Sequence, residues 1–111
     1  MPEAPILRAI PDVGESWDDP SEDLILLLLE DVDAGDSAFL IIERLADRSG
    51  QTYVQAARKT DGTYVVEHRE GSPDRHFGTV AGDIRAAHSL LTGWAFQLDG
   101  WRELADWSPV R

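Results

Sequence analysis

The residues best suited to chemistry are three histidines and the carboxylates near them. His68, His76 and His88 show no pair at the spacing that places two imidazoles on one helical turn. A metal site would need His68, His76 and a carboxylate brought together in space. An acid–base pair of His68 with Glu67 or Glu70 is a second arrangement, although strand neighbours such as Glu67 and His68 point to opposite faces.

Other catalytic signatures are missing from the sequence. There is no Gly-x-Ser-x-Gly elbow, no glycine-rich phosphate loop and no cysteine. The acids at 31, 33 and 36 are spaced like part of a calcium loop, but the glycine and terminal glutamate of such a loop are absent. We therefore expect no enzyme activity, no cofactor and no metal, and we expect function through binding.

Charge is concentrated in the first third of the chain. The formal net charge is −11, and residues 1–37 hold eleven acids against Arg8 alone, a net of −10. Phosphate backbones would be repelled, so no nucleic-acid partner is expected, whereas a basic protein would be attracted. Alternatively, the acids serve solubility only. The acidic face predicted to bind a partner comprises Asp18, Asp19, Glu22, Asp23, Glu30, Asp31, Asp33 and Asp36.

Tryptophans near the C-terminus are a second candidate surface. Trp101 and Trp107 belong to a type enriched in interface hot spots, and with Leu104 they recur every third residue. Tryptophan is also a large core filler, so these side chains belong either to a partner or dimer contact or to the core.

Length and composition indicate one domain outside the membrane. The chain of 111 residues suits a single domain, and its longest apolar run, at 24–29, is far shorter than the roughly 20 residues of a membrane helix. No secretory signal is evident and cysteine is absent, so a cytoplasmic location and no membrane partner are expected.

The pattern of elements predicts an α+β fold. Residues 1–18 contain three prolines and are expected to form an irregular arm, followed by a single domain over 19–111. A helix is expected over 20–32, with Asp19 as cap and Pro20 in its first turn. Residues 24–29 would alternatively form a buried strand, because so short a run fits both.

Strand-like runs follow at 39–45, 52–58 and 63–69, separated by tight turns that include Asp61-Gly62. With a short edge strand at 75–78 they predict an antiparallel meander of three to four strands. A long helix opening at Thr79 would pack on this sheet through a stripe of apolar residues, before the Trp-rich C-terminal segment. The stripe consists of Val80, Ile84, Ala87, Leu91 and Trp94.

The segment GTYVVEHREGSPDRHF at 62–77 resembles the Imm1-like family of bacterial immunity proteins. The resemblance covers about 50–107 and includes the strand ending in Glu67, the following turn and helix, and a tryptophan near the C-terminus. It implies a bacterial protein that neutralises a toxin by binding it, without a cofactor. An acidic member would suit a basic toxin. The alternative function is a homodimeric adaptor or chaperone-like module.

Overall fold

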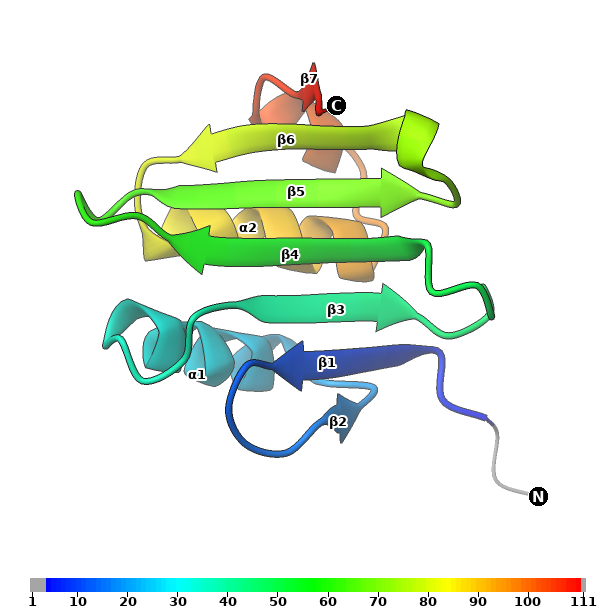
Figure 1. Ribbon diagram of the computed structural model, residues 1–111, viewed down its shortest axis with the longest axis horizontal. Coiled ribbons are helices and arrows are strands. Elements are labelled where there is room, and N and C mark those ends of the chain that lie inside the picture. The colour runs from blue at the N-terminus through cyan, green and yellow to red at the C-terminus, as the bar shows by residue number, and fades with distance from the viewer. Residues whose placement is uncertain (1–3, 111) are drawn as a thin grey trace.

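Residues 4–110 form a seven-stranded antiparallel sheet with two α-helices on one face (Figure 1). The computed structural model describes residues 4–110. The strands lie in the order β2-β1-β3-β4-β5-β6-β7, so consecutive strands β3 to β6 form the meander. The α+β class is confirmed, but the sheet is larger than the predicted three or four strands because both chain ends add to its edges.

Three central strands lie within one residue of their predicted limits. They are β3 (Leu40–Arg44), β4 (Thr52–Arg58) and β5 (Tyr64–Glu70). Strand β6 (His76–Ala81) runs three residues beyond its predicted end, after the 3-10 turn η1 (Pro73–Arg75). It remains paired with β5 as far as Ala81 opposite Tyr64, and this pairing keeps Thr79 and Val80 out of the following helix.

The prediction of an irregular N-terminal arm is wrong for residues 7–11 and 17–18. Strand β1 (Leu7–Pro11) pairs with β3 along its whole length, and the short β2 (Trp17–Asp18) pairs with β1. Leu7 and Ala9 alternate into the core, which supplies the period of two that a half-buried strand needs. Residues 1–3 of the expected arm lie outside the described part of the chain.

Helix α1 (Glu22–Asp33) confirms the helical interpretation of the leucine-rich run. Ser21 is the N-cap in place of Asp19, since its side chain accepts a hydrogen bond from the Leu24 backbone N–H. Asp19 instead has a φ of 46° and accepts hydrogen bonds from the backbone N–H groups of Ile6 and Leu7. Its carboxylate thus anchors the start of β1.

Helix α2 (Ile84–Ala95) begins five residues after the predicted Thr79. Asp83 is its N-cap and accepts a hydrogen bond from the Ala86 backbone N–H at 2.8 Å. From Ile84 onward the predicted stripe faces the sheet, whereas Val80 belongs to β6 and is exposed. The helix is followed by the 3-10 turn η2 (Trp101–Leu104) and by β7 (Ser108–Pro109), which pairs with β6.

The hydrophobic core lies between the sheet and the two helices. Its largest fully buried side chain is Tyr64, whose hydroxyl donates a 2.8 Å hydrogen bond to the Asp33 carboxylate at the end of α1. None of the helices within residues 4–110 is long and apolar enough to cross a membrane. All the helical cover is on one side, so the other side of the sheet is open.

Candidate functional site

The uncovered side of the sheet, which we call the open sheet face, carries three rows of side chains set by the strand register. Alternate residues of each strand point to this side. Two rows cross all five strands β1, β3, β4, β5 and β6, and a shorter third row crosses β4, β5 and β6. The rows are Arg8–Glu43–Tyr53–Arg69–His76, Ile10–Ile41–Gln55–Glu67–Gly78 and Ala57–Val65–Val80.

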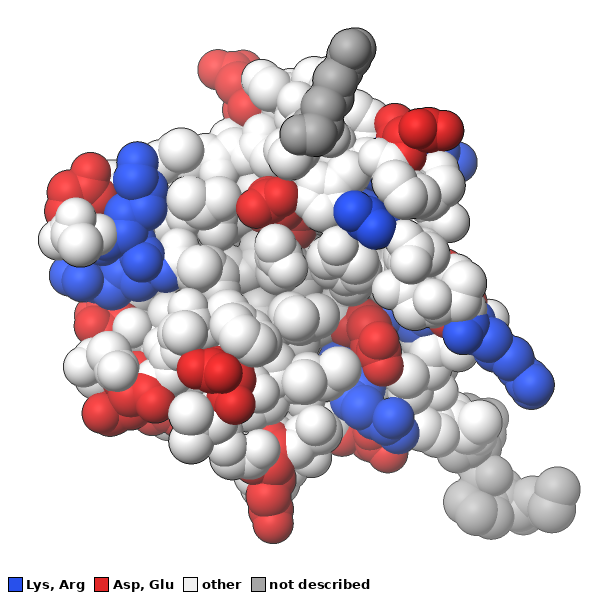
Figure 2. Space-filling model, viewed as in Figure 1, with Lys and Arg blue, Asp and Glu red and all other residues white. Residues whose placement is uncertain are grey.

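Much of this face is apolar although no helix in the described part of the chain covers it. Ile10, Ile41, Ala57 and Val65 are half-buried, and Val80 is 57% exposed. Figure 2 shows the face from the front, with uncharged surface over much of its middle, a few acidic and basic groups within the face, and further charged groups around the margin. A sheet face that only meets water usually presents polar residues at its outward positions. The apolar outward positions here are typical of a surface that meets another molecule.

A shallow hollow lies within the apolar part of the open sheet face. It has a volume of about 260 Å³ and is lined in part by Phe39, Ile41, Ala57 and Val65, with Gln55 and Glu67 at its polar side. The hollow is too small for most organic ligands, whose pockets span roughly 300–1,000 Å³. It is large enough for one protruding side chain of a partner.

A polar network crosses the remaining part of the face. Arg69 donates through Nη1 to Gln51 Oε1 at 2.6 Å and through Nε to His76 Nδ1 at 2.9 Å. His76 Nε2 lies 2.7 Å from Glu67 Oε1, and Gln55 donates to the other oxygen of Glu67 at 3.4 Å. The network fixes side chains from β4, β5 and β6 relative to one another.

His68 and His76 lie on opposite faces of the sheet. Arg69 pairs with His76 across β5 and β6, so His68, one residue earlier, points into the core while His76 points to the open side. No site therefore joins His68, His76 and a carboxylate. The structure joins His76 to the carboxylate of Glu67 and leaves His68 apart from them.

Both C-terminal tryptophans surround the buried His68. The ring centroids of Trp101 and Trp107 lie 5.2 Å and 4.6 Å from that of His68, and both indoles are half-buried against the core. The Cβ of Trp101 is so close to Gly93 of α2 that a methyl group there would lie 2.5 Å from it. Both indoles therefore serve the packing of the C-terminal segment against the core. Their binding of a partner stays a prediction.

Glu70 completes the surroundings of His68. Its Oε1 lies 2.9 Å from His68 Nδ1 and 3.6 Å from Arg102 Nη2. The interaction with His68 is the main cause that lowers the pKa of Glu70, against the opposing effect of burial, and the Arg102 charge adds to it. The contact between Glu70 and Arg102 links the C-terminal segment to β5.

The eight predicted acidic residues are all exposed and fall into two groups at the ends of α1. At the N-terminal end, Asp18 forms a 2.7 Å ion pair with Arg8. Glu22 and Asp23 occupy the first turn, where the helix dipole favours negative charge. The acids at this end therefore have a structural explanation. The group comprises Asp18, Asp19, Glu22 and Asp23.

The acids at the C-terminal end of α1 oppose the helix dipole. Glu30, Asp31 and Asp33 lie in or near the last turn, which has no basic residue, and Asp36 follows in the loop to β3. Asp33 has partners, because it accepts from Tyr64 and lies 3.5 Å from Arg58 Nε. Negative charge at this end of a helix costs stability, so folding does not account for the other three acids.

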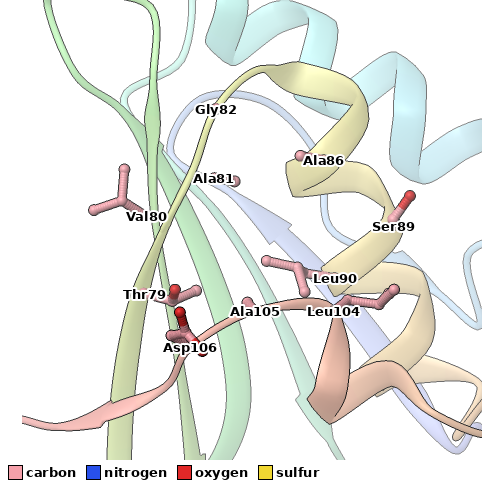
Figure 3. Close-up of a pocket in the computed structure, with 10 residues that line it drawn as sticks. All are labelled: Thr79, Val80, Ala81, Gly82, Ala86, Ser89, Leu90, Leu104, Ala105 and Asp106. Carbon is pink, nitrogen blue, oxygen red and sulfur yellow. The ribbon is translucent and has the colours of Figure 1, made fainter.

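A second groove lies beside β6, between that strand, α2 and the segment after η2 (Figure 3). It has a volume of about 600 Å³, and Figure 3 shows Leu90 and Leu104 on its α2 side and Thr79 near Asp106 on its other side. Val80 points away from this groove, toward the open sheet face. The lining is mostly small or apolar and offers no set of acid–base groups.

Metal chemistry finds no support in the described residues. Within 4–110, no three His, Asp or Glu side chains are grouped so that they could hold an ion.

Comparison with known proteins finds no matching family model, no matching curated protein and no matching solved structure.

Proposed function

We propose that this protein is a non-enzymatic binding domain whose open sheet face docks a basic protein partner. The observation that carries the proposal is the row of apolar side chains at outward strand positions that no helix covers. Burying apolar surface against a partner is favourable by about 25 cal/mol per Å² of apolar area, a gain that is set against the entropy cost of association. The resemblance to Imm1-like immunity proteins favours a toxin as the partner.

The chemistry of the partner is inferred from the charge. Residues 1–37 carry a net charge of −10, and the loop at the C-terminal end of α1 leads directly into β3 of the open sheet face. A basic surface would be drawn to these carboxylates, and charge steering raises association rates mainly at low salt. The three acids that folding does not explain would then be explained by binding.

The partner to test is a basic toxin domain, and a neighbouring gene that encodes a secreted protein with a basic C-terminal domain would supply it. We expect a one-to-one complex that abolishes the toxicity of that domain in cells, with an association rate that falls as salt rises. Full toxicity in the presence of excess binder would contradict the proposal.

Charge variants at the two ends of α1 give a matched comparison. In the double variant Asp31→Asn/Asp36→Asn the association rate falls, because two carboxylates that folding does not use are removed. The control Glu22→Gln/Asp23→Asn removes the same charge at the other end of the helix. Equal rates for the two variants and the unmodified protein would refute a role for the C-terminal group.

Self-association is the competing use of the same face. A homodimeric adaptor would bury the apolar rows against a second copy of the chain. Light scattering at tens of micromolar protein distinguishes the two uses: we expect a monomer of 12.3 kDa, and a dimer whose interface is lost on changing Ile41 and Val80 would favour the adaptor.

A further inference from the structure

The geometry around His76 fixes its tautomer and its charge. A guanidinium group only donates hydrogen bonds, so the 2.9 Å contact with Arg69 Nε requires an unprotonated Nδ1 on His76. The proton of the neutral ring must then be on Nε2, which donates to Glu67 Oε1 at 2.7 Å. His76 in this structure is a neutral bridge between a cation and a carboxylate.

The ring is enclosed, although it lies on the uncovered side of the sheet. His76 is only 6% exposed. The Tyr53 ring stands edge-on at 6.0 Å from it, and Arg69 extends over Tyr53 with its guanidinium carbon 5.6 Å from that ring. The charged and titratable groups that face His76 are thus Glu67 and Arg69 of β5 and Tyr53 of β4, while Asp74 of η1 lines the same groove.

Protonation of His76 is incompatible with the contact to Arg69. A proton on Nδ1 would point at the Nε–H of Arg69, and two cations would face each other at hydrogen-bond distance. Glu67 would hold the imidazolium more strongly than the neutral ring, so Arg69 is the group that leaves. The groove beside these residues has a volume of about 860 Å³, which gives the arginine room to move.

We propose that His76 is a proton-controlled latch that sets the position of Arg69 on the open sheet face. With neutral His76, Arg69 lies over Tyr53 and is held by His76 and Gln51. With protonated His76, the ring pairs with Glu67, and Arg69 is released while the face gains one positive charge. If the proposed function is correct, acidification then weakens the docking of a basic partner. The latch itself requires no partner.

Nitrogen-15 NMR of the imidazole ring and the Arg69 Nε–H group tests the latch on the isolated protein. Histidine is the side chain whose charge ordinarily changes near neutral pH, so spectra are recorded from pH 8 downward for as long as the protein stays folded. At the upper end we expect an unprotonated Nδ1, a protonated Nε2 and a slowly exchanging Arg69 Nε–H. The Arg69 signal should change with the same midpoint as the ring. An Arg69 signal that does not follow the His76 titration would overturn the proposal.

Two variants test whether Arg69 and Glu67 act on the His76 ring as their contacts require. Arg69→Gln removes the competing cation, so the His76 ring should titrate at higher pH than in the unmodified protein. Glu67→Gln removes the carboxylate, so the ring should titrate at lower pH. His88, whose Nε2 lies 2.9 Å from the Glu22 carbonyl oxygen far from this network, is the internal control and should not move. Shifts of the same sign, or none, would refute the latch.

Failure of the latch and failure of the proposed function are distinguishable. The NMR titration needs no partner, so an inactive toxin assay leaves the latch result standing. Conversely, a complex that forms with unchanged affinity from pH 8 to pH 5.5, measured with the same basic domain, contradicts the coupling of latch and docking while it supports the docking itself.

Discussion

Replacing Gly93 with alanine tests how the C-terminal segment is attached. A Cβ at this position would lie 2.5 Å from the Trp101 Cβ and 3.6 Å from its Cα, so the indole and its backbone must move. Overpacking typically costs about 1–3 kcal/mol, and a clash that also displaces the Trp101 backbone lies at the upper value, about 3 kcal/mol. Alanine in place of glycine within a helix returns about 1 kcal/mol. The net effect is a loss of about 2 kcal/mol.

Urea denaturation and thermal unfolding measure this loss. A domain of this size loses roughly 4 °C of Tm per kcal/mol, so Gly93→Ala should unfold about 8 °C lower. Movement of Trp101 away from His68 should also change the tryptophan fluorescence of the native state.

Gly82→Ala is the matched control. No atom lies within 4 Å of a Cβ placed at Gly82, so this change should alter the free energy of unfolding by less than about 0.5 kcal/mol. If Gly93→Ala were as stable as the unmodified protein, with unchanged fluorescence, the close packing of Trp101 on α2 would be refuted.

Three further predictions concern Tyr64, Glu70 and the charges at the two ends of α1. Tyr64→Phe removes the 2.8 Å hydrogen bond to Asp33 and should cost about 1.5 kcal/mol in urea denaturation. Burial, then this hydrogen bond, raises the pKa of Tyr64, so stability should fall as pH rises beyond about 10, and less steeply in Tyr64→Phe. The pKa of Glu70 is lowered chiefly by His68, so its carboxylate stabilises the fold above about pH 4.3 and this contribution is lost on acidification. In Glu70→Gln the free energy of unfolding should therefore fall less steeply as the pH is lowered. An unchanged dependence on pH would contradict this role. Asp31→Asn should raise stability and Glu22→Gln should lower it, because the two residues lie at opposite ends of the α1 dipole, and equal signs would exclude that explanation.

The meander could be predicted because its signals are local. Alternating apolar residues and the Asp61-Gly62 turn fix β4 and β5 without reference to the rest of the chain. The pairing of β1 with β3 is non-local, and the prolines around Leu7 and Ala9 hid a strand of five residues. The start of α2 was placed too early for a similar reason. Thr79 is held in β6 by its pairing with β5, and the helix propensity of the local sequence does not reveal this pairing.

The candidate site was predicted less well than the fold. The acids of α1 are exposed, and the tryptophans pack on His68, which is the core alternative of the two that the sequence left open. The open sheet face was not identified, and the sequence allowed a site of His68 beside His76 and a carboxylate, because the sequence does not show which side of the sheet the helices cover. The alternation along β5 separates two faces but does not say which one the helices bury. One face carries Val65, Glu67 and Arg69, and the other carries Tyr64, Val66 and His68.

The central claim is that the open sheet face docks a basic protein, and the affinity of one triple variant tests it most directly. Ile41→Thr/Val65→Thr/Val80→Thr keeps three β-branched side chains on β3, β5 and β6 while making the face polar. The control, Leu27→Gln, changes an apolar side chain of α1 that is 59% exposed and lies on the helical side. Measured by calorimetry against the basic domain, the triple variant should bind at least tenfold more weakly and the control equally well. Unchanged affinity of a folded triple variant would contradict the claim.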